Sequence, residues 1–110
     1  MKLTENETPK EYTFAGIQLG GPRTSILARH VAFNETLTSL HLCRKNIQDQ
    51  DGVDLARMLL TNKTLRKLEL EGNCLGSKSA KEFATALTHN TTLKFLDLES
   101  NALSMEGDDP

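Results

Sequence analysis

Two closely spaced pairs of side chains in this chain could bind a metal ion. His41 and Cys43 are two positions apart, and Glu69 and Glu71 repeat that spacing further along the chain. Imidazole, thiolate and carboxylate groups are the ligands that zinc takes in proteins. However, Cys74 is the only other cysteine, and no second Cys or His pair stands at ligand spacing. The sequence therefore predicts neither a metal ion nor another cofactor.

Four carboxylates form a second group that could bind a partner or take part in catalysis. Asp97 and Glu99 follow Glu69 and Glu71 at the same interval that separates Glu69 from His41. The group either docks a basic surface of a partner or forms a solvated face that nearby Lys and Arg side chains partly neutralise, and both interpretations remain open. Catalysis would need a nucleophile with a base and a group that orients the base. No such set is visible, so we expect that the chain is not an enzyme.

The elements that position these side chains belong to an internal repeat. Asn34, Asn62 and Asn90 recur with a period of 28 and begin the segments NETLTSLHL, NKTLRKLEL and NTTLKFLDL. Leucine alternates with polar residues in each segment, which is typical of a strand with one buried face. A fixed period of this length indicates a solenoid, in which each unit buries its apolar side against its neighbours.

The second half of each unit is predicted to be a helix. Apolar or small residues recur there at positions i, i+3, i+4 and i+7, which places them on one face. A recurring alanine on this face lets the helix lie close to the strand layer. The residues expected to point inward are Thr24, Leu27, Ala28 and Val31, then Gly52, Leu55, Ala56 and Leu59, then Ala80, Phe83, Ala84 and Leu87.

Residues 65–75 and 93–103 both follow the pattern LxxLxLxxNxL, within units of this period that carry a full helix. In these features the chain resembles leucine-rich repeat proteins of the ribonuclease-inhibitor type, over about residues 34–103 and more loosely over 6–33. The resemblance implies an α/β fold, a right-handed solenoid with a parallel sheet on the concave side and helices on the convex side. It also implies that Asn73 and Asn101 bond to the backbone of neighbouring turns. Lys45 holds that place in the first full unit, so its turn either has a different shape or uses Asn46 instead.

Four segments make up the predicted domain organisation. Residues 1–33 form a divergent N-terminal repeat or cap, 34–61 and 62–89 are repeats, and 90–110 are an incomplete C-terminal repeat with an acidic tail. We expect the leucines of this last segment to lack a covering helix. Three explanations remain open: the chain is a segment of a longer repeat protein, it pairs with a second copy through this edge, or the tail folds back as a cap.

The resemblance implies protein–protein interaction or scaffolding through the concave strand face, in a cytoskeletal, ciliary or signalling setting. Carboxylates would meet a basic surface on the protein partner, and an aromatic residue would add apolar contact. Two alternatives remain open, a GTPase-activating or enzyme-inhibiting module and a self-associating repeat fragment. The expected partner-binding residues are His41, Glu69, Glu71, Phe95, Asp97 and Glu99.

Composition excludes several other classes of partner. The net charge of −2 and the pI of about 5.9 argue against nucleic-acid binding by bulk charge. No apolar run approaches the length of a membrane span, and the N-terminal MKLTENETPKEY lacks the apolar core of a signal peptide. Two cysteines do not make a disulfide framework, and we expect Cys74 to be a buried thiol in a turn. The expected location is the cytoplasm, with no membrane or nucleic-acid partner.

Overall fold

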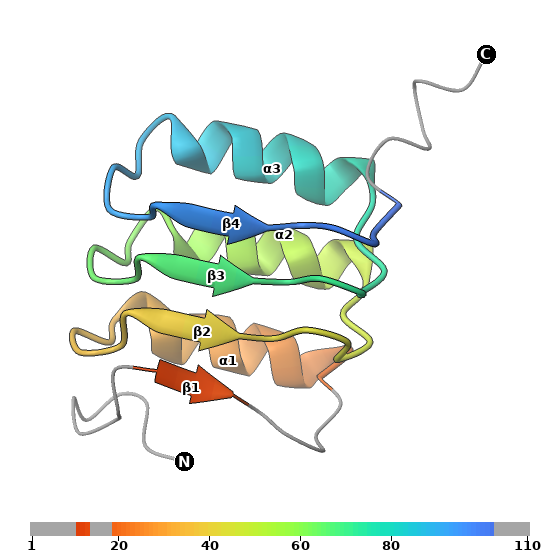
Figure 1. Ribbon diagram of the computed structural model, residues 1–110, viewed down its shortest axis with the longest axis horizontal. Helices are drawn as coiled ribbons and strands as arrows, with labels where there is room; N and C mark the ends of the chain where they lie inside the picture. The colour runs from red at the N-terminus through yellow and green to blue at the C-terminus, as the bar shows by residue number, and fades with distance from the viewer. Residues whose placement is uncertain (1–10, 14–18, 103–110) are drawn as a thin grey trace.

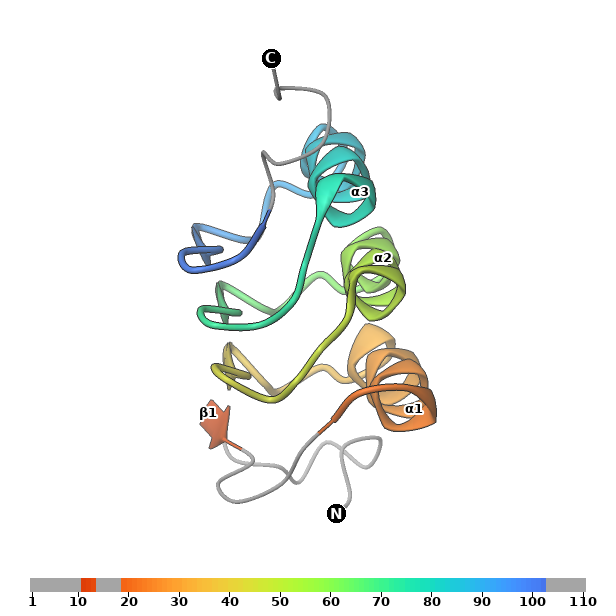
Figure 2. The same ribbon diagram turned by 90° about the vertical axis from the view of Figure 1, so that its right-hand side faces the viewer.

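A computed structural model describes residues 11–13 and 19–102 of the chain. Strands and helices alternate, and the strands form one parallel sheet in chain order while the helices lie in a layer on one side of it (Figures 1 and 2). No described helix has the length and apolar character needed to cross a membrane. The elements are β1 (Glu11–Thr13), α1 (Pro22–Ala32), β2 (Ser39–His41), α2 (Asp49–Met58), β3 (Lys67–Glu69), α3 (Ser77–Leu87) and β4 (Phe95–Asp97).

The strand register confirms the predicted period. Tyr12 lies opposite Leu40, Leu40 opposite Leu68, and Leu68 opposite Leu96. Because the strands are parallel and offset by one whole unit, residues at equivalent positions stack in columns across the sheet. Leu40 and Leu68 have no exposed surface, as expected for the inner column of a two-layer core.

The inward face predicted for the helices is confirmed in α1 and α2 and is partly wrong in α3. All four expected residues of α1 and of α2 are buried, whereas Ala84 and Leu87 of α3 are exposed. The reason is that α2 packs between α1 and α3, while α3 has a described neighbour on one side alone. Phe83 and Ala86, which face that neighbour and the sheet, are buried.

A column of asparagines links successive units at the turn before each strand. The side-chain amide of Asn62 donates to the carbonyl oxygens of Val31 (2.7 Å) and Asn34 (3.2 Å). Asn90 repeats this pattern one unit later, donating to Leu59 and Asn62. The side-chain oxygen of each asparagine accepts the backbone N–H three positions on, so one amide shapes the turn and joins two units.

A second asparagine column follows the strands, as the resemblance implied. Asn73 donates to the carbonyl oxygens of Leu42 and Leu70, both at 2.9 Å, and accepts the N–H of Lys45 at 2.8 Å. Asn101 donates in the same way to Leu70 and Leu98 at 3.0 Å.

The turn at Lys45 has a different shape, and Asn46 does not replace the missing asparagine. Asn46 has a positive φ of 61°, and its side chain accepts a hydrogen bond from Gln48 within the same turn. The left-handed position that recurs in the turns after β2, β3 and β4 is two positions earlier, at Arg44, Gly72 and Ser100.

The N-terminal turn of α2 serves both neighbouring helices. Neither α1 nor α3 has an acidic residue in its first turn, whereas α2 has two. Asp49 accepts the backbone N–H groups of Gly76 (2.8 Å) and Ser79 (2.9 Å) at the start of α3. Asp51 accepts the N–H of Gly21, before α1, at 3.2 Å. Carboxylates from one unit thus satisfy N–H groups that a helix start leaves without an intrahelical partner.

Candidate functional site

The sheet places the expected partner-binding residues on its exposed side, which we call the strand face. Ser39, Lys67 and Phe95 form one column of paired positions. His41, Glu69 and Asp97 form the next column. Glu71 and Glu99 lie just past the strand ends. The stacking continues there, because the backbone N–H of Arg44 donates to Glu71 and that of Gly72 donates to Glu99. The predicted grouping of carboxylates therefore exists, but its members differ in their partners.

Glu69 already contacts other residues of the chain. Its carboxylate forms a hydrogen bond with Nδ1 of His41 and lies 3.5 Å from Nζ of Lys67. The hydrogen bond with His41 lowers the pKa of Glu69, and Lys67 adds to this effect against the opposing influence of burial. Glu69 and His41 are therefore bonded to each other on the strand face, and a partner that bound either side chain would have to break this contact.

Glu71 and Cys43 lie beside this pair. Glu71 forms an exposed ion pair with Arg44 at 3.4 Å, which is weak in the presence of solvent and salt. Burial, together with the charges of Glu69, Glu71 and Asp97, raises the pKa of the Cys43 thiol despite a hydrogen bond with the backbone of Glu71. A thiol that holds its proton is a poor nucleophile and a poor metal ligand.

The strand face ends in an apolar and acidic area at β4. Phe95 is 48% exposed, and Nζ of Lys67 lies 5.2 Å from the centre of its ring, within the range of a cation–π contact. Asp97 and Glu99 form no ion pair with any residue in 19–102, although Asp97 accepts the N–H of Glu99 at 3.0 Å. We define the β4 patch as the five residues that line a shallow hollow here: Phe95, Leu96, Asp97, Leu98 and Glu99.

The sequence interpretation missed Lys67 as a member of this site. Lys67 stands one repeat unit before Phe95 and two positions before Glu69, so the repeat itself places it beside both. In the structure Lys67 contacts one aromatic ring and one carboxylate of the strand face.

The described residues gather no group of three His, Cys, Asp or Glu side chains that could hold a metal ion. The expectation that Cys74 is buried is wrong. Cys74 is exposed because its backbone, and not its side chain, faces the neighbouring unit: its N–H donates to the carbonyl oxygen of Ile47 at 2.8 Å.

Comparison with known proteins identifies the repeat. The family model described as "Leucine Rich repeat" matches residues 61–84 and 89–107. Comparison with curated protein sequences gives no match. Among solved structures, that titled "Leiomodin-1 Actin-Binding Site 2" is similar with a TM-score of 0.82 and 21% identity, over 93% of this chain and 59% of that one. The tropomodulin C-terminal domain of Caenorhabditis elegans is similar with a TM-score of 0.79 and 18% identity, over 91% of this chain and 61% of that one.

These likenesses establish the fold, a stack of leucine-rich repeats with parallel strands and covering helices. The chain spans about three fifths of the length of both solved structures. The assignment to the ribonuclease-inhibitor type stays a prediction, because neither the family model nor these two structures specify that subclass.

Proposed function

Because the chain is a leucine-rich repeat protein, we propose that it is a non-catalytic protein-interaction or scaffolding module that binds its partner through the strand face. The observation that carries this proposal is the β4 patch. Phe95 is half exposed there, and the carboxylates of Asp97 and Glu99 have no ion-pair partner within residues 19–102. The partner surface that complements the patch is basic around an apolar centre.

The energetics favour Phe95 as the anchor and the two carboxylates as guides. Removing the exposed half of an aromatic side chain from water contributes on the order of 1 kcal/mol. Exposed carboxylates contribute less to affinity, and they act mainly on the association rate and on the choice of partner. Glu69 and His41 have a different role in this proposal: their contact keeps the middle of the strand face rigid beside the patch.

The two similar structures suggest which partner to test first. One is described as an actin-binding site of leiomodin-1, and the other belongs to tropomodulin. We propose a cytoskeletal setting in the cytoplasm, with actin as the first candidate partner. The support is that the leiomodin-1 structure aligns with 93% of this chain.

Charge reversal on the strand face tests the proposal. Cosedimentation with purified actin filaments, and capture of proteins from cytoplasmic extract, would compare the parent chain with the double variant Asp97→Lys/Glu99→Lys. We expect the variant to bind at least about tenfold more weakly, and the parent to lose affinity as salt rises. The matched control is Asp54→Lys/Glu82→Lys, which makes the same change of net charge on the helices.

Two results would contradict the proposal. Equal binding by the parent and the strand-face variant would exclude the β4 patch. Equal weakening by the strand-face and helix variants would show that net charge, and not this surface, determines binding. Capture of other proteins without actin would leave the strand face as the binding surface and exclude only the candidate partner.

A further inference from the structure

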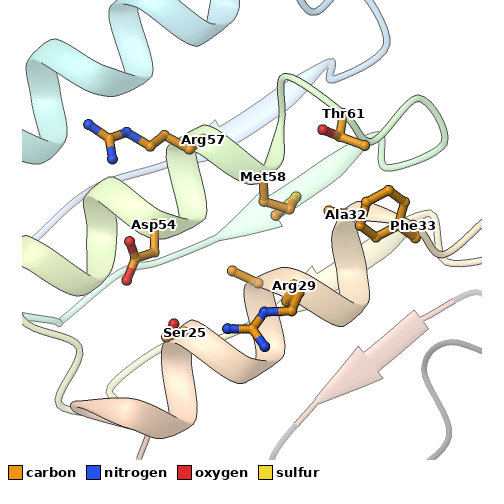
Figure 3. Close-up of a pocket in the computed structure, with 9 residues that line it drawn as sticks. Ser25, Arg29, Ala32, Phe33, Asp54, Arg57, Met58 and Thr61 are labelled. Carbon is orange, nitrogen blue, oxygen red and sulfur yellow. The ribbon is translucent and has the colours of Figure 1, made fainter.

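A groove on the opposite side of the molecule separates α1 from α2. It is shallow, with a volume of about 230 Å³, and it lies on the helix layer, away from the strand face (Figure 3). We call it the helix groove. Its lining residues are Ser25, Ala28, Arg29, Ala32 and Phe33 from α1 and its C-terminal end, and Asp54, Arg57, Met58 and Thr61 from α2 and the turn that follows.

Small side chains on α1 leave the groove open. Ala28 and Met58 are buried and form its apolar floor, and Ala32 continues the floor toward the end of α1. Figure 3 shows Met58 in the middle of the groove, with Phe33 standing at one end beside Ala32. A second hollow, of about 340 Å³, adjoins this end and is also lined by Phe33 and Thr61. Phe33 therefore lines two neighbouring depressions.

The repeat does not explain Phe33. Its side chain is 67% exposed, the largest fraction among the exposed large apolar residues of the described chain. Thr61 and His89 hold the same place in the next two units. The turn after a helix can therefore be built with a polar residue at this place, so an exposed aromatic ring here is not needed for folding. Aromatic residues, Phe among them, are enriched in the buried cores of protein interfaces.

The charge of the groove indicates what it would bind. Two arginines line it against one aspartate, although the chain as a whole has a net charge of −2. Arg29 is exposed and forms no ion pair within the described ranges. Arg57 forms one exposed pair, with Glu82 at 3.4 Å, which a ligand carboxylate can replace at little cost.

We propose that the helix groove binds a short acidic segment of a partner protein that carries one large apolar side chain. The apolar side chain would lie on Ala32 and Met58 against the ring of Phe33, and flanking carboxylates would contact Arg29 and Arg57. Arginine suits this role because its planar guanidinium can hold a carboxylate with two parallel hydrogen bonds. The segment has the opposite charge to the basic partner of the strand face, so the two surfaces select different ligands.

Selection of random peptides displayed on phage, with the folded chain as bait, tests this inference without knowledge of the natural partner. We expect the selected peptides to be rich in Asp and Glu around a Leu, Ile or Phe. Fluorescence anisotropy with one such peptide, labelled and synthesised, would then measure its Kd for the parent and the variants. Phe33→Thr introduces the residue that the next unit carries at this position, and Arg29→Glu reverses one charge. Each should weaken binding by about tenfold or more.

The matched control is Ile26→Thr, because Ile26 is a 52% exposed apolar residue on the same helix that does not line the groove. We expect it to leave the Kd unchanged, and thermal melts of all variants would verify that they are folded. Three outcomes would overturn the inference. The selection could enrich no peptides or only basic ones, Phe33→Thr could leave binding unaffected, or Ile26→Thr could weaken binding as much as Phe33→Thr. Loss of peptide binding in Asp97→Lys/Glu99→Lys would place the peptide on the strand face instead.

Discussion

Asp49 shows at the scale of one residue how neighbouring units depend on each other. Its carboxylate accepts hydrogen bonds from three backbone N–H groups of the next unit, those of Gly76, Lys78 and Ser79, and from Oγ of Ser79 at 2.7 Å. It replaces an N-cap that α3 lacks, since Gly76 at the start of α3 has no side chain to accept a hydrogen bond. This contact could not be predicted from the residue pattern, because it joins groups of different units that meet only when the units are stacked.

Substitution of Asp49, which belongs to α2, should therefore destabilise α3. We expect Asp49→Ala to lower the free energy of unfolding by about 1 kcal/mol, the usual cost of losing a helix cap, as measured by urea denaturation at neutral pH. Asp54→Ala is the control on the same helix, and it should change stability by less than about 0.5 kcal/mol. Similar losses in both variants would show that Asp49 contributes only through the net charge of α2.

The same substitution predicts a pH dependence with a definite sign. Burial opposes ionisation of Asp49, but the hydrogen bonds from Ser79, Gly76 and Lys78 outweigh it and lower the pKa. A lowered pKa means that the contribution is complete above the ordinary aspartate pKa of about 3.9 and is lost as the pH falls through the folded-state value. The stability gap between the parent and Asp49→Ala should thus close in acid. A gap that persists well below the ordinary pKa would be evidence against this role.

At the scale of the elements, Gly52 sets how closely α2 and α3 approach. A Cβ atom at this position would lie 2.5 Å from Cδ2 of Leu75 and would also collide with Oγ of Ser79. Ser79 cannot move freely, because its hydroxyl donates to the carboxylate of Asp49 and also lies 2.8 Å from the backbone oxygen of that residue. The helical pattern predicted that Gly52 points inward, but the lack of space for a single methyl group could be learned only from the packed structure.

We expect Gly52→Ala to destabilise the chain even though alanine is the better helix former. Overpacking costs roughly 1–3 kcal/mol, against a gain in helix propensity of about 1 kcal/mol. Thermal and urea unfolding would measure the net loss. Ser79→Gly removes the colliding side chain. The double variant Gly52→Ala/Ser79→Gly should therefore lose less stability than the sum of the losses of the two single variants. Additive losses would mean that the methyl group is accommodated by other movements.

The elements were predicted well from the sequence because one physical constraint repeats. Parallel strands joined by units of equal length must align equivalent residues of successive units, so the columns of the strand face followed directly from the period. The sequence did not reveal which carboxylates have partners. Side-chain reach determines that Glu69 contacts His41 while Asp97 forms no ion pair among the residues that the structure describes. The exposure of Phe33 depends on how tightly two helices pack. These details decide the proposed binding surfaces.

At the scale of the whole molecule, the described stack has apolar surface beside β4 and α3. Leu93, Leu96 and Leu98 are half buried, although their equivalents in the two preceding units are buried completely. Leu87 is 39% exposed at the end of α3. The outer edge of β4 has no strand partner among residues 11–13 and 19–102. Apolar surface next to such an edge favours association with another chain, which is the self-association that the sequence suggested.

We expect the chain to associate weakly as its concentration rises. Light scattering over a series of concentrations should show an increase in mean mass for the parent and less of an increase for Leu87→Glu. Leu60→Glu is the matched control, because Leu60 is similarly exposed, at 43%, but belongs to the turn after α2. A mean mass that stays monomeric for the parent, or an equal reduction by both variants, would argue against association through α3 and β4.

The asparagine column before the strands has a consequence for how the protein can be produced. Asn34, Asn62 and Asn90 each begin an Asn-x-Thr triplet, the acceptor sequence for N-linked sugar. However, all three are no more than 4% exposed. The side chain of Asn34 is bonded within its own turn, and those of Asn62 and Asn90 are also bonded to the preceding unit. A glycan on the side-chain nitrogen of Asn62 or Asn90 would occupy the space where the preceding unit stacks. Export through a eukaryotic secretory pathway would therefore set oligosaccharide transfer in competition with folding, whereas synthesis in a bacterial host would not.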